Sequence, residues 1–434
     1  MSKACGRVRL AEGLIIAAPS SGSGKTVVTL AILRALKRLG VNVASAKAGP
    51  DYIDPRFHEA ATAKPCLNLD PWAMRSALVK SLLAKQARDA ELVIVEGVMG
   101  LFDGAENAQG STADLAAATG LPVVLVVDAS RQAQSVAALV HGFKTWRQDI
   151  NLAAIILNRV GSPRHAEVLK ASLKGIHVIG ALPRLDHLEL PSRHLGLVQA
   201  DELETLETFL EQAADAVVEH LDLGALPSEP VARFAAMPCL PPLAQTMAIA
   251  RDEAFGFLYA HLWTSWQAQG AELKFFSPLA DDHIPHAQAI FLPGGYPELH
   301  AEKLAAATKF RRTLLMAADK ALIYGECGGF MVLGDAIIDA KGKRHAMTGL
   351  LPVTTSLEKR KLHLGYRRLT HNSPLPWATN LRGHEFHYST TTNMGQADAL
   401  FTAMDSRNAP LAPMGLQKGS VMGSYAHIID AEPS

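Results

Sequence analysis

Cysteine is scarce in this sequence, with four residues in a chain of 434. The four lie far apart and form no CxxC pair: Cys5, Cys66, Cys239 and Cys327. Disulfide frameworks of small domains and zinc or iron–sulfur clusters depend on characteristic cysteine spacings, so the sequence supports neither. The 17 histidines are also scattered. We expect most of them to be surface or core residues rather than metal ligands.

Long apolar runs and an excess of one charge are also absent. No apolar stretch, Leu121–Val127 among them, approaches the roughly 20 residues that span a bilayer. The N-terminus lacks the apolar segment typical of a signal peptide. Basic and acidic residues number 42 each, which argues against a nucleic-acid binder with a basic face. We expect a cytoplasmic protein with no nucleic-acid or membrane partner.

The sequence does contain the material for large cores. Hydrophobic residues make up 48% of the chain, and the length predicts two to three domains of roughly 150 residues each. Short apolar runs without polar alternation are typical of parallel strands covered on both faces. Such runs occur at 14–18, 41–46, 92–95, 122–127 and 153–157. Amphipathic stretches lie between them, so we predict a doubly wound parallel α/β sheet, which binds ligands at the carboxyl ends of its strands.

A proline-rich stretch near 221–242 interrupts this rhythm and is typical of an interdomain linker. Beyond it, strands are expected at 247–250, 272–276 and 289–292, and a helix at 255–269. We therefore predict an N-terminal domain over 1–222, a linker over 223–244 and a second α/β domain over 245–434.

The first predicted strand runs into PSSGSGKT at 19–26. This string nearly matches the phosphate loop GxxxxGK[ST], with Pro19 in place of the first glycine. Backbone N–H groups at the following helix N-terminus cradle phosphates, the lysine reaches the outer phosphates, and the hydroxyl ligates Mg²⁺. The expected nucleotide-binding residues are Gly22, Ser23, Gly24, Lys25 and Thr26.

Carboxylates that hold Mg²⁺ beside the phosphates are expected at neighbouring strand ends. Glu96 ends the run LVIVE, where a Walker B acid lies, and Asp51 follows the second strand in KAGPDYID. With Asp54, which follows on the same turn, they place three acids at one edge of the predicted sheet. This clustering favours Glu96 and Asp51 as metal ligands beside the Thr26 hydroxyl. Asp54 is expected to be exposed on this turn, and Asp103 lies in VEGVMGLFDG. Both are candidates for the region that binds the substrate and its activated form.

Two further polar residues end predicted strands. Asp128 ends LVVD and has a structural or a functional interpretation. Asn158 follows AAIIL, and its amide either reads an adenine edge or simply terminates the strand. We include Asn158 among the nucleotide-binding candidates.

Cys327 lies in GECGG between an apolar stretch and a helical pattern. Glycines around a strand-to-helix turn present a nucleophile, and a helix N-terminus is expected to lower the pKa of the thiol. The amide of Gly328 would donate to an oxyanion, and those of Gly294 and Gly295 in LPGGYPE would supply a second donor. A cysteine nucleophile also needs a base. The residues alone leave three candidates, His427 in GSYAH and both histidines of GHEFHYS: His384 and His387.

The strings together resemble the cobyrinic or hydrogenobyrinic acid a,c-diamide synthases, the corrin-amidating enzymes of cobalamin biosynthesis. The N-terminal half is similar to the dethiobiotin-synthetase-like group of P-loop proteins, and the C-terminal half to class I glutamine amidotransferases of the cobyric-acid branch. The strings that carry the resemblance are APSSGSGKT, KAGPDYIDP, VEGVMGLFDG, LNRVGSPRH, SRHLGLV, LPGGYPE, GECGGFMVLG, GHEFHYS and GSYAHI.

The resemblance implies two coupled reactions. Glutamine is hydrolysed at Cys327 through a thioester, which releases ammonia. ATP with Mg²⁺ phosphorylates a corrin acetate carboxylate, and ammonia displaces the phosphate to form the amide. The family's S-Y-x-H string implies that His427 is the base, and Thr26, Asp51 and Glu96 match the magnesium ligands of the related group.

The sequence departs from many amidotransferases at the position two residues after the base. Glutamate is common there, whereas this chain has Ile429, followed by Asp430. The residue that orients His427 is therefore unassigned, as is the role of the GHEFHYS loop.

Two other functions are compatible with a P-loop domain followed by an amidotransferase-like domain. Cobyric acid synthase shares both domains but amidates other side chains, and KAGPDYID and GHEFHYS favour the a,c-diamide enzyme. A regulatory P-loop ATPase with a non-catalytic sensor domain is opposed by the intact Cys327 and His427. The expected partners are ATP, L-glutamine and a corrinoid carboxylate. Of the two macrocycles, the cobalt-free one is favoured. A homodimer is a further expectation.

Overall fold

The computed structural model describes residues 10–185, 188, 192–193, 196–197 and 199–432. Cys5 and part of SRHLGLV (192–198) therefore lie outside the described residues. Two compact units make up the chain: Met1–Trp72, Ser76–Gly104 and Ala108–Met237 form the first, and Ala73–Arg75, Ala105–Asn107 and Pro238–Ser434 form the second. Within the described ranges, no helix combines the length and apolar character required to cross a membrane.

The first unit is built on a parallel sheet with strand order β3-β2-β4-β1-β5-β6-β7. Its strands are β1 (Glu12–Ala17), β2 (Val43–Ala48), β3 (Leu67–Leu69), β4 (Leu92–Glu96), β5 (Val123–Asp128), β6 (Leu152–Val160) and β7 (Val178–Pro183). Two-residue strands complete the unit: β8 (Ser192–Arg193), β9 (Gly196–Leu197) and β10 (Glu229–Pro230).

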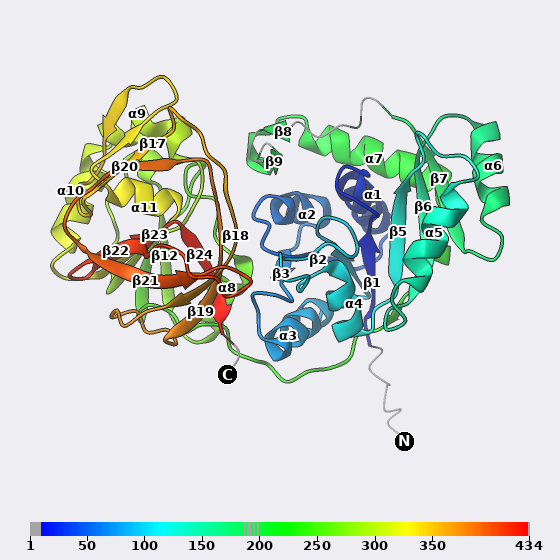
Figure 1. The fold of residues 1–434 in the computed structure, drawn as a ribbon, viewed down its shortest axis with the longest axis horizontal. Coiled ribbons are helices and arrows are strands. Elements are labelled where there is room, and N and C mark those ends of the chain that lie inside the picture. The colour runs from blue at the N-terminus through cyan, green and yellow to red at the C-terminus, as the bar shows by residue number, and fades with distance from the viewer. Residues whose placement is uncertain (1–9, 186–187, 189–191, 194–195, 198, 433–434) are drawn as a thin grey trace, which may run out of the picture. The chain divides into compact units, whose positions relative to one another are not determined.

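Helices cover both faces of this sheet, with α1, α2 and α7 on one face and α3 and α4 on the other (Figure 1). The helices are α1 (Lys25–Arg38), α2 (Asp54–Thr62), α3 (Ser76–Ala87), α4 (Thr112–Thr119), α5 (Val136–Thr145), α6 (Pro163–Ser172) and α7 (Leu206–His220). Short 3₁₀ turns are η1 (Ala200–Glu202) and η2 (Leu223–Ala225). Leu14–Ile16 and Val123–Val127 are fully buried, so these strands read as continuous apolar runs rather than alternating ones.

The predicted doubly wound sheet is confirmed, with two details that the sequence did not predict. The three-residue strand β3 and the strand β7 extend the sheet at its two ends. Part of the predicted linker also belongs to the first unit, because β10 pairs antiparallel with the start of β1. The boundary between the units lies between Met237 and Pro238.

The second unit contains a ten-stranded mixed sheet with the order β12-β11-β13-β14-β23-β22-β21-β18-β19-β24. Its strands are β11 (Thr246–Ala250), β12 (Glu272–Phe276), β13 (Ala289–Leu292), β14 (Leu322–Glu326), β18 (His363–Thr370), β19 (Asn380–His387), β21 (Asp398–Met404), β22 (Met414–Lys418), β23 (Val421–Ser424) and β24 (Ala426–Ala431). The part from β12 to β23 is parallel, whereas the part from β23 to β24 is antiparallel.

A four-stranded sheet and short helices complete the second unit. The smaller sheet comprises β15 (Ala336–Ile338), β16 (Arg344–Ala346), β17 (Val353–Ser356) and β20 (Thr390–Met394). The helices are α8 (Ala260–Ala268), α9 (Ala301–Ala306), α10 (Thr308–Ala317) and α11 (Gly328–Leu333), with 3₁₀ turns η3 (Pro278–Ala280) and η4 (Pro297–His300). The core includes Phe255, Phe310 and Ile323, all fully buried.

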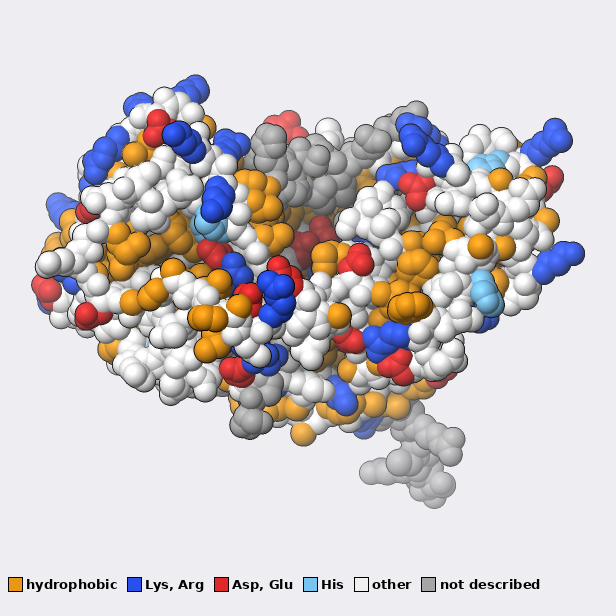
Figure 2. Space-filling model, viewed as in Figure 1, with side chains coloured by type: hydrophobic (Ala, Val, Ile, Leu, Met, Phe, Trp, Pro, Cys, Tyr) orange, Lys and Arg blue, Asp and Glu red, His pale blue; other side chains and the backbone are white. Residues whose placement is uncertain are grey.

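The predicted helix over 255–269 begins only at Ala260. Phe257 instead forms an isolated bridge with Gly294, and its N–H donates to the Gly294 carbonyl at 2.9 Å. This bond holds the loop after β13 against the segment that precedes α8. Elsewhere on the molecule, Figure 2 shows Lys and Arg side chains interspersed with Asp and Glu side chains on the face in view.

Candidate functional site

The phosphate loop joins β1 to α1, as its sequence predicts. Gly22 and Gly24 have φ of 81° and 83°, a left-handed backbone that glycine adopts without strain. A Cβ on Gly24 would also overlap the Asn158 amide nitrogen. Ser23 is buried, and its carbonyl accepts a 2.9 Å hydrogen bond from Asn158 Nδ2. Asn158 therefore holds the loop from the end of β6.

A cavity of about 340 Å³ opens beside this loop within the first unit. Its lining combines polar groups at the loop with an apolar wall and includes Gly24, Val28, Asn158, Arg159, Leu182 and Leu188. The Arg159 guanidinium donates to Gly22 O at 2.8 Å and pairs with Asp128 at 2.6 Å. Asp128 therefore supports the arginine beside the loop, which is a structural role.

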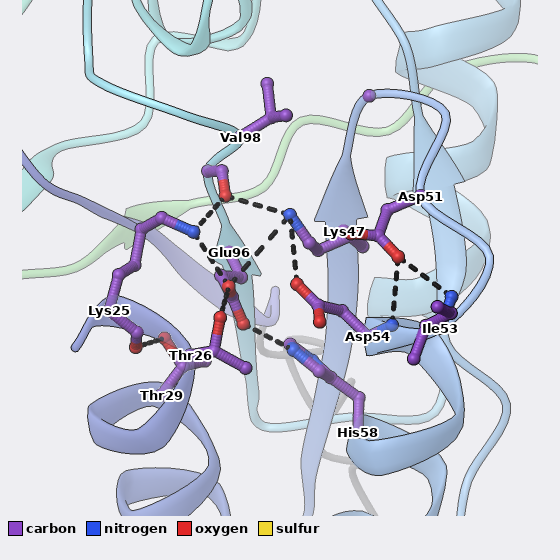
Figure 3. Close-up of polar contacts among 12 residues, drawn as sticks. Lys25, Thr26, Thr29, Lys47, Asp51, Ile53, Asp54, His58, Glu96 and Val98 are labelled. Atoms are coloured by element: carbon purple, nitrogen blue, oxygen red, sulfur yellow. Dashed lines mark hydrogen bonds and ion pairs between the residues drawn. The ribbon is translucent and has the colours of Figure 1, made fainter. Parts of the chain in front are cut away.

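Glu96 is the centre of a polar cluster at the carboxyl ends of β1, β2 and β4 (Figure 3). Its Oε1 accepts from Lys25 Nζ at 2.8 Å and from the Thr26 hydroxyl at 2.7 Å. Its Oε2 lies 2.7 Å from His58 Nε2. Glu96 and His58 are both fully buried. The predicted neighbourhood of lysine, hydroxyl and carboxylate is thus present in one cluster.

Lys47 extends the cluster toward α2. It lies beside Glu96 in the register of β2 and β4, and its ammonium is 3.5 Å from Asp54 Oδ2 and 3.9 Å from Glu96 Oε1. Asp51 is half-buried, and its Oδ1 accepts from the N–H groups of Ile53 and Asp54 at the start of α2 (Figure 3). The expectation that Asp54 is exposed is wrong, because it is packed at the helix start and only 9% exposed.

Burial and neighbouring charges shift the pKa values in this cluster in opposite directions. Burial acts to raise the pKa of Glu96, but Lys25, Lys47 and His58 hold it well below the usual range. Burial, with Asp51 and Glu96 nearby, raises the pKa of Asp54 to about 8. The pKa values of these two neighbouring carboxyl groups are therefore shifted in opposite directions, that of Glu96 downward and that of Asp54 upward.

Two residues of this cluster were not among the predicted site residues: Lys47 and His58. Burial acts to lower the pKa of His58, but Cys66 and the hydrogen bond with Glu96 raise it to about 9. His58 follows Asp54 by four residues, so the two share a face of α2. That spacing was the available signal in the sequence. Asp103, in contrast, is exposed and accepts from Gly100 N–H at 2.9 Å.

In the second unit, Cys327 occupies the turn between β14 and α11. Its backbone has φ 47° and ψ −104°, a strained conformation for a residue with a Cβ. The turn is held because Cys327 N–H donates to Ser424 O at 2.8 Å. A Cβ on Gly329 would overlap the Leu292 carbonyl, so only glycine allows this turn to pack closely against the end of β13.

The predicted oxyanion glycines lie close to this turn. A Cβ on Gly294 would overlap His427 Cε1 and lie 3.3 Å from Cys327 Cβ. A Cβ on Gly328 would lie 3.1 Å from the Gly295 nitrogen. The backbone at Gly294–Gly295 therefore comes near the turn at Cys327–Gly328, with the His427 imidazole beside it.

Of the three candidate bases, His427 is the one packed with Cys327 around Gly294. His427 is fully buried on β24, and Glu326 Oε2 lies 3.7 Å from its Nδ1. His384 is its registered neighbour on β19. The Cys327 thiol itself donates to the Phe386 carbonyl, with sulfur and oxygen 4.0 Å apart.

His387 belongs to a separate polar network. Its Nε2 is 2.8 Å from Glu385 and its Nδ1 is 2.8 Å from the Ser389 hydroxyl. Potential metal-ligand atoms of His363, Glu385 and His387 lie within 4.8 Å of one another. However, the Arg367 guanidinium also pairs with Glu385 at 2.7 Å and opposes a cation there. Burial acts to raise the pKa of Glu385, but His387 and Arg367 lower it to about 2.

The predicted lowering of the Cys327 pKa is wrong. Burial and the Glu298 carboxylate raise the pKa of the thiol, although the Gly328 N–H opposes them. Burial, together with His384 and His387, lowers the pKa of His427 to about 3. The resting pair is therefore a neutral thiol and a neutral imidazole. A thiol in this state would need proton transfer to a base before it could act as a nucleophile, because it is not a preformed thiolate.

Comparisons with known families and proteins match both halves of the chain. Residues 14–198 match the CobQ/CobB/MinD/ParA nucleotide binding domain, and residues 246–433 match the CobB/CobQ-like glutamine amidotransferase domain.

Full-length relatives carry the same name in several bacteria. The hydrogenobyrinate a,c-diamide synthase of Brucella suis biovar 1 is 52% identical over 429 residues, covering 96% of this chain and 98% of that protein. The protein of that name from Rhizobium meliloti is 51% identical, covering 96% and 99%. The one from Rhodobacter capsulatus is 49% identical, covering 96% and 98%. This chain belongs to the hydrogenobyrinate a,c-diamide synthase family.

Proposed function

We propose that this ligase amidates the a and c acetate carboxylates of hydrogenobyrinate, with ATP as the activating co-substrate and glutamine as the nitrogen source. The names of the relatives support the substrate. One structural observation carries the proposal: Cys327 and His427 flank Gly294 in the amidotransferase unit, while a separate P-loop cluster is centred on Glu96. The chain thus has groups for releasing ammonia and for activating a carboxylate.

Glutamine hydrolysis is assigned to the second unit. His427 takes the thiol proton as the Cys327 sulfur attacks the carboxamide carbon, and the resulting oxyanion accepts from the amides near Gly328, Gly294 and Gly295. The C–N bond breaks as His427 returns the proton to the leaving nitrogen. Water then hydrolyses the thioester to glutamate.

Carboxylate activation is assigned to the P-loop unit. A carboxylate resists attack by ammonia because its leaving group would be an oxide ion. Transfer of the γ-phosphoryl group to a carboxylate oxygen creates an acyl phosphate, and ammonia then displaces inorganic phosphate. Gly22, Ser23, Gly24 and Lys25 are proposed to bind the phosphates, with Asn158 near the nucleoside.

Thr26, Asp51 and Glu96 are proposed to hold Mg²⁺ with the nucleotide. A hydroxyl and two carboxylates suit this ion, which prefers oxygen ligands, and Thr26 Oγ1 and Glu96 Oε1 are already 2.7 Å apart. The ion supplies charge neutralisation at the phosphates. Lys25 and Lys47 add positive charge on the protein side of the same cluster.

Asp54 and Asp103 are proposed to lie along the carboxylate and acyl phosphate region. The buried Asp54 pairs with Lys47, and Asp103 supports the glycine loop after β4. The proposed division of labour assigns carboxylate activation to the first unit and glutamine hydrolysis to the second, with the boundary between Met237 and Pro238 inside the predicted 223–244 linker. A homodimer is tested by light scattering on the purified protein.

Mass spectrometry of the products tests this function. Hydrogenobyrinate and cobyrinate are each incubated with ATP, Mg²⁺ and either glutamine or an ammonium salt. The proposal expects two successive replacements of a carboxylic OH by NH₂, located by fragmentation at the a and c acetates. Amidation at propionate side chains, or ATP hydrolysis with no corrinoid product, would contradict it.

A further inference from the structure

The described residues that follow His427 in the chain do not supply a carboxylate to orient its imidazole. The position two residues later is Ile429, whose carbonyl is 3.1 Å from His261 Nε2. Asp430 is buried and engaged with Arg75, whose Nε and Nη2 each donate to its carboxylate at 2.9 Å. Neither residue offers His427 a carboxylate.

Glu326 offers His427 a carboxylate from another strand of the same sheet. It is the last residue of β14, directly before Cys327, and its Oε2 lies 3.7 Å from His427 Nδ1. Its other oxygen accepts a 3.0 Å hydrogen bond from Ile428 N–H. We propose that Glu326 is the positioning residue for His427, so that a Cys327–His427–Glu326 triad performs glutamine hydrolysis. This inference rests on the glutaminase half of the proposed function.

The two imidazole nitrogens face different groups, and this division supports the proposal. Nδ1 is the nitrogen near Glu326. A Cβ on Gly294 would lie 3.0 Å from Nε2 and 3.3 Å from Cys327 Cβ, so Nε2 is on the side of the nucleophile. A carboxylate at Nδ1 favours the tautomer that carries its proton there. In that tautomer, the lone pair of Nε2 accepts the thiol proton.

Glu326 also acts on the protonated form of the base. Burial raises the pKa of Glu326 to about 8, so its carboxylate form grows as the pH rises toward and above that value. When this form is present and His427 takes the thiol proton, the imidazolium forms beside a carboxylate in a buried site, where their attraction is strong. The 3.7 Å separation is longer than a hydrogen bond, and such contacts commonly tighten when substrate binds.

Other titratable groups also face this pair. His384, His387 and Glu385 act on His427 from β19. Tyr324 lies near Glu326 on β14, and Glu298 acts on the thiol from the loop after β13. Glu326 and Glu298 both oppose thiolate formation by charge alone. Glu326 lies within ion-pair distance of His427, with its Oε2 3.7 Å from Nδ1.

Because Glu326 lies beside His427 and Glu298 acts on the thiol, replacing each carboxylate should shift the pH dependence of thiol reactivity in opposite directions. The rate of Cys327 alkylation by iodoacetamide is measured against pH for wild type, Glu326→Gln and Glu298→Gln. Removing Glu298 removes repulsion of the thiolate, so its profile should move to lower pH. Removing Glu326 also removes the carboxylate that stabilises the imidazolium formed when His427 takes the thiol proton, so alkylation assisted by His427 should need a higher pH and its profile should move to higher pH. A shift of Glu326→Gln to lower pH, or no shift, overturns the proposal.

Steady-state kinetics give the second readout. Glu326→Gln should lower kcat for glutamine by about 10³-fold or more, as loss of the orienting carboxylate does in other triads, with little change in KM. Glu326→Asp should recover part of this loss. Amidation driven by ammonium should stay near wild type in both variants and shows that they fold. A glutamine kcat within a few-fold of wild type in Glu326→Gln overturns the proposal.

A measurement on the unmutated protein covers the case in which the variants do not fold. With ¹⁵N-labelled histidine, the His427 signals are assigned by comparison with His427→Gln and recorded above the pH of about 8 to which burial raises the pKa of Glu326. A proton on Nδ1 supports the proposal, and a proton on Nε2 overturns it. If the enzyme proves inactive with every nitrogen source, the proposed function fails, while this tautomer and the alkylation profiles still decide the role of Glu326.

Discussion

Replacing Gly294 with alanine should disable glutamine hydrolysis and leave ammonium-driven amidation intact. The new Cβ would overlap His427 Cε1 and lie 3.0 Å from its Nε2. Restoring an ordinary carbon–carbon contact of about 3.5 Å requires the ring to retreat by roughly 1 Å. The retreat must occur in a fully buried site, whose neighbours leave the ring little space.

The magnitude follows from this displacement. A misplacement of about 1 Å between reacting groups costs about 10²-fold in rate, or roughly 3 kcal/mol in the barrier. The same methyl group lies 3.3 Å from Cys327 Cβ and crowds the space beside the thiol. We therefore expect kcat/KM for glutamine to fall by about 10²-fold or more.

The assay compares glutamate release with corrinoid amidation driven by ammonium. Gly142→Ala is the matched control, because Gly142 lies within α5 and a Cβ there would meet no atom within 4 Å. Both activities of that control should match wild type. If Gly294→Ala hydrolyses glutamine within a few-fold of wild type, His427 is not the base in the arrangement described. If it loses the ammonium reaction as well, the two activities are not separable.

Further substitutions test the other assignments. Cys327→Ser and His427→Ala should each abolish glutamine use while ammonium still supports amidation, measured as glutamate and corrinoid products. Glu96→Gln and Asp51→Asn should each lower ATP-dependent amidation by about 10²-fold or more, because the carboxylate charge holds Mg²⁺ at the phosphates; glutamate release should persist, and a drop of only a few-fold would exclude that acid as a ligand. His58 has its pKa raised to about 9, so its contribution to stability is complete below about pH 6.5 and is lost as pH rises toward about 9. Thermal unfolding should therefore show His58→Gln losing more stability at pH 6 than at pH 9, and an equal loss at both would contradict this linkage.

The N-terminal sheet was predictable because its physical signal is local. Parallel strands buried on both faces appear as uninterrupted apolar runs, and β1, β4 and β5 each stand out in this way. β3 has only three residues, and β7 contains glycine and proline, so neither produced a comparable signal. The P-loop was also local, since its glycines, lysine and hydroxyl are consecutive in the sequence.

The second unit was predicted less completely. Its parallel strands were recognised as far as β14, the apolar stretch before the turn at Cys327, but the strands after α11 were not. β18 reads HLGYRRLT, and most of its residues are only half-buried. Such a strand has neither a continuous apolar run nor a clean alternation. Its identity depends on pairing with β19 and β21, which a single-sequence pattern does not contain.

The site residues that were missed are buried polar groups whose partners are distant in the chain. Lys47 and His58 gain their roles from Glu96, about 40 to 50 residues away. The pKa of Cys327 was mispredicted for the same reason. A short helix after the thiol was visible in the sequence, but its burial and the neighbouring Glu298 carboxylate were not.

Glu326 illustrates why chain order alone does not reveal a triad. Many amidotransferases have a glutamate two residues after the base, where this chain has Ile429. In the proposed triad the base lies on β24. The acid ends β14 and the nucleophile follows it in the turn, so these two are consecutive residues. The strained turn at Cys327 makes this arrangement possible, because consecutive residues on a regular strand would point to opposite faces of the sheet. Glu326 can therefore approach Nδ1 of His427 while Cys327 is on the side of Nε2, and the constellation is recognised by geometry rather than by sequence position.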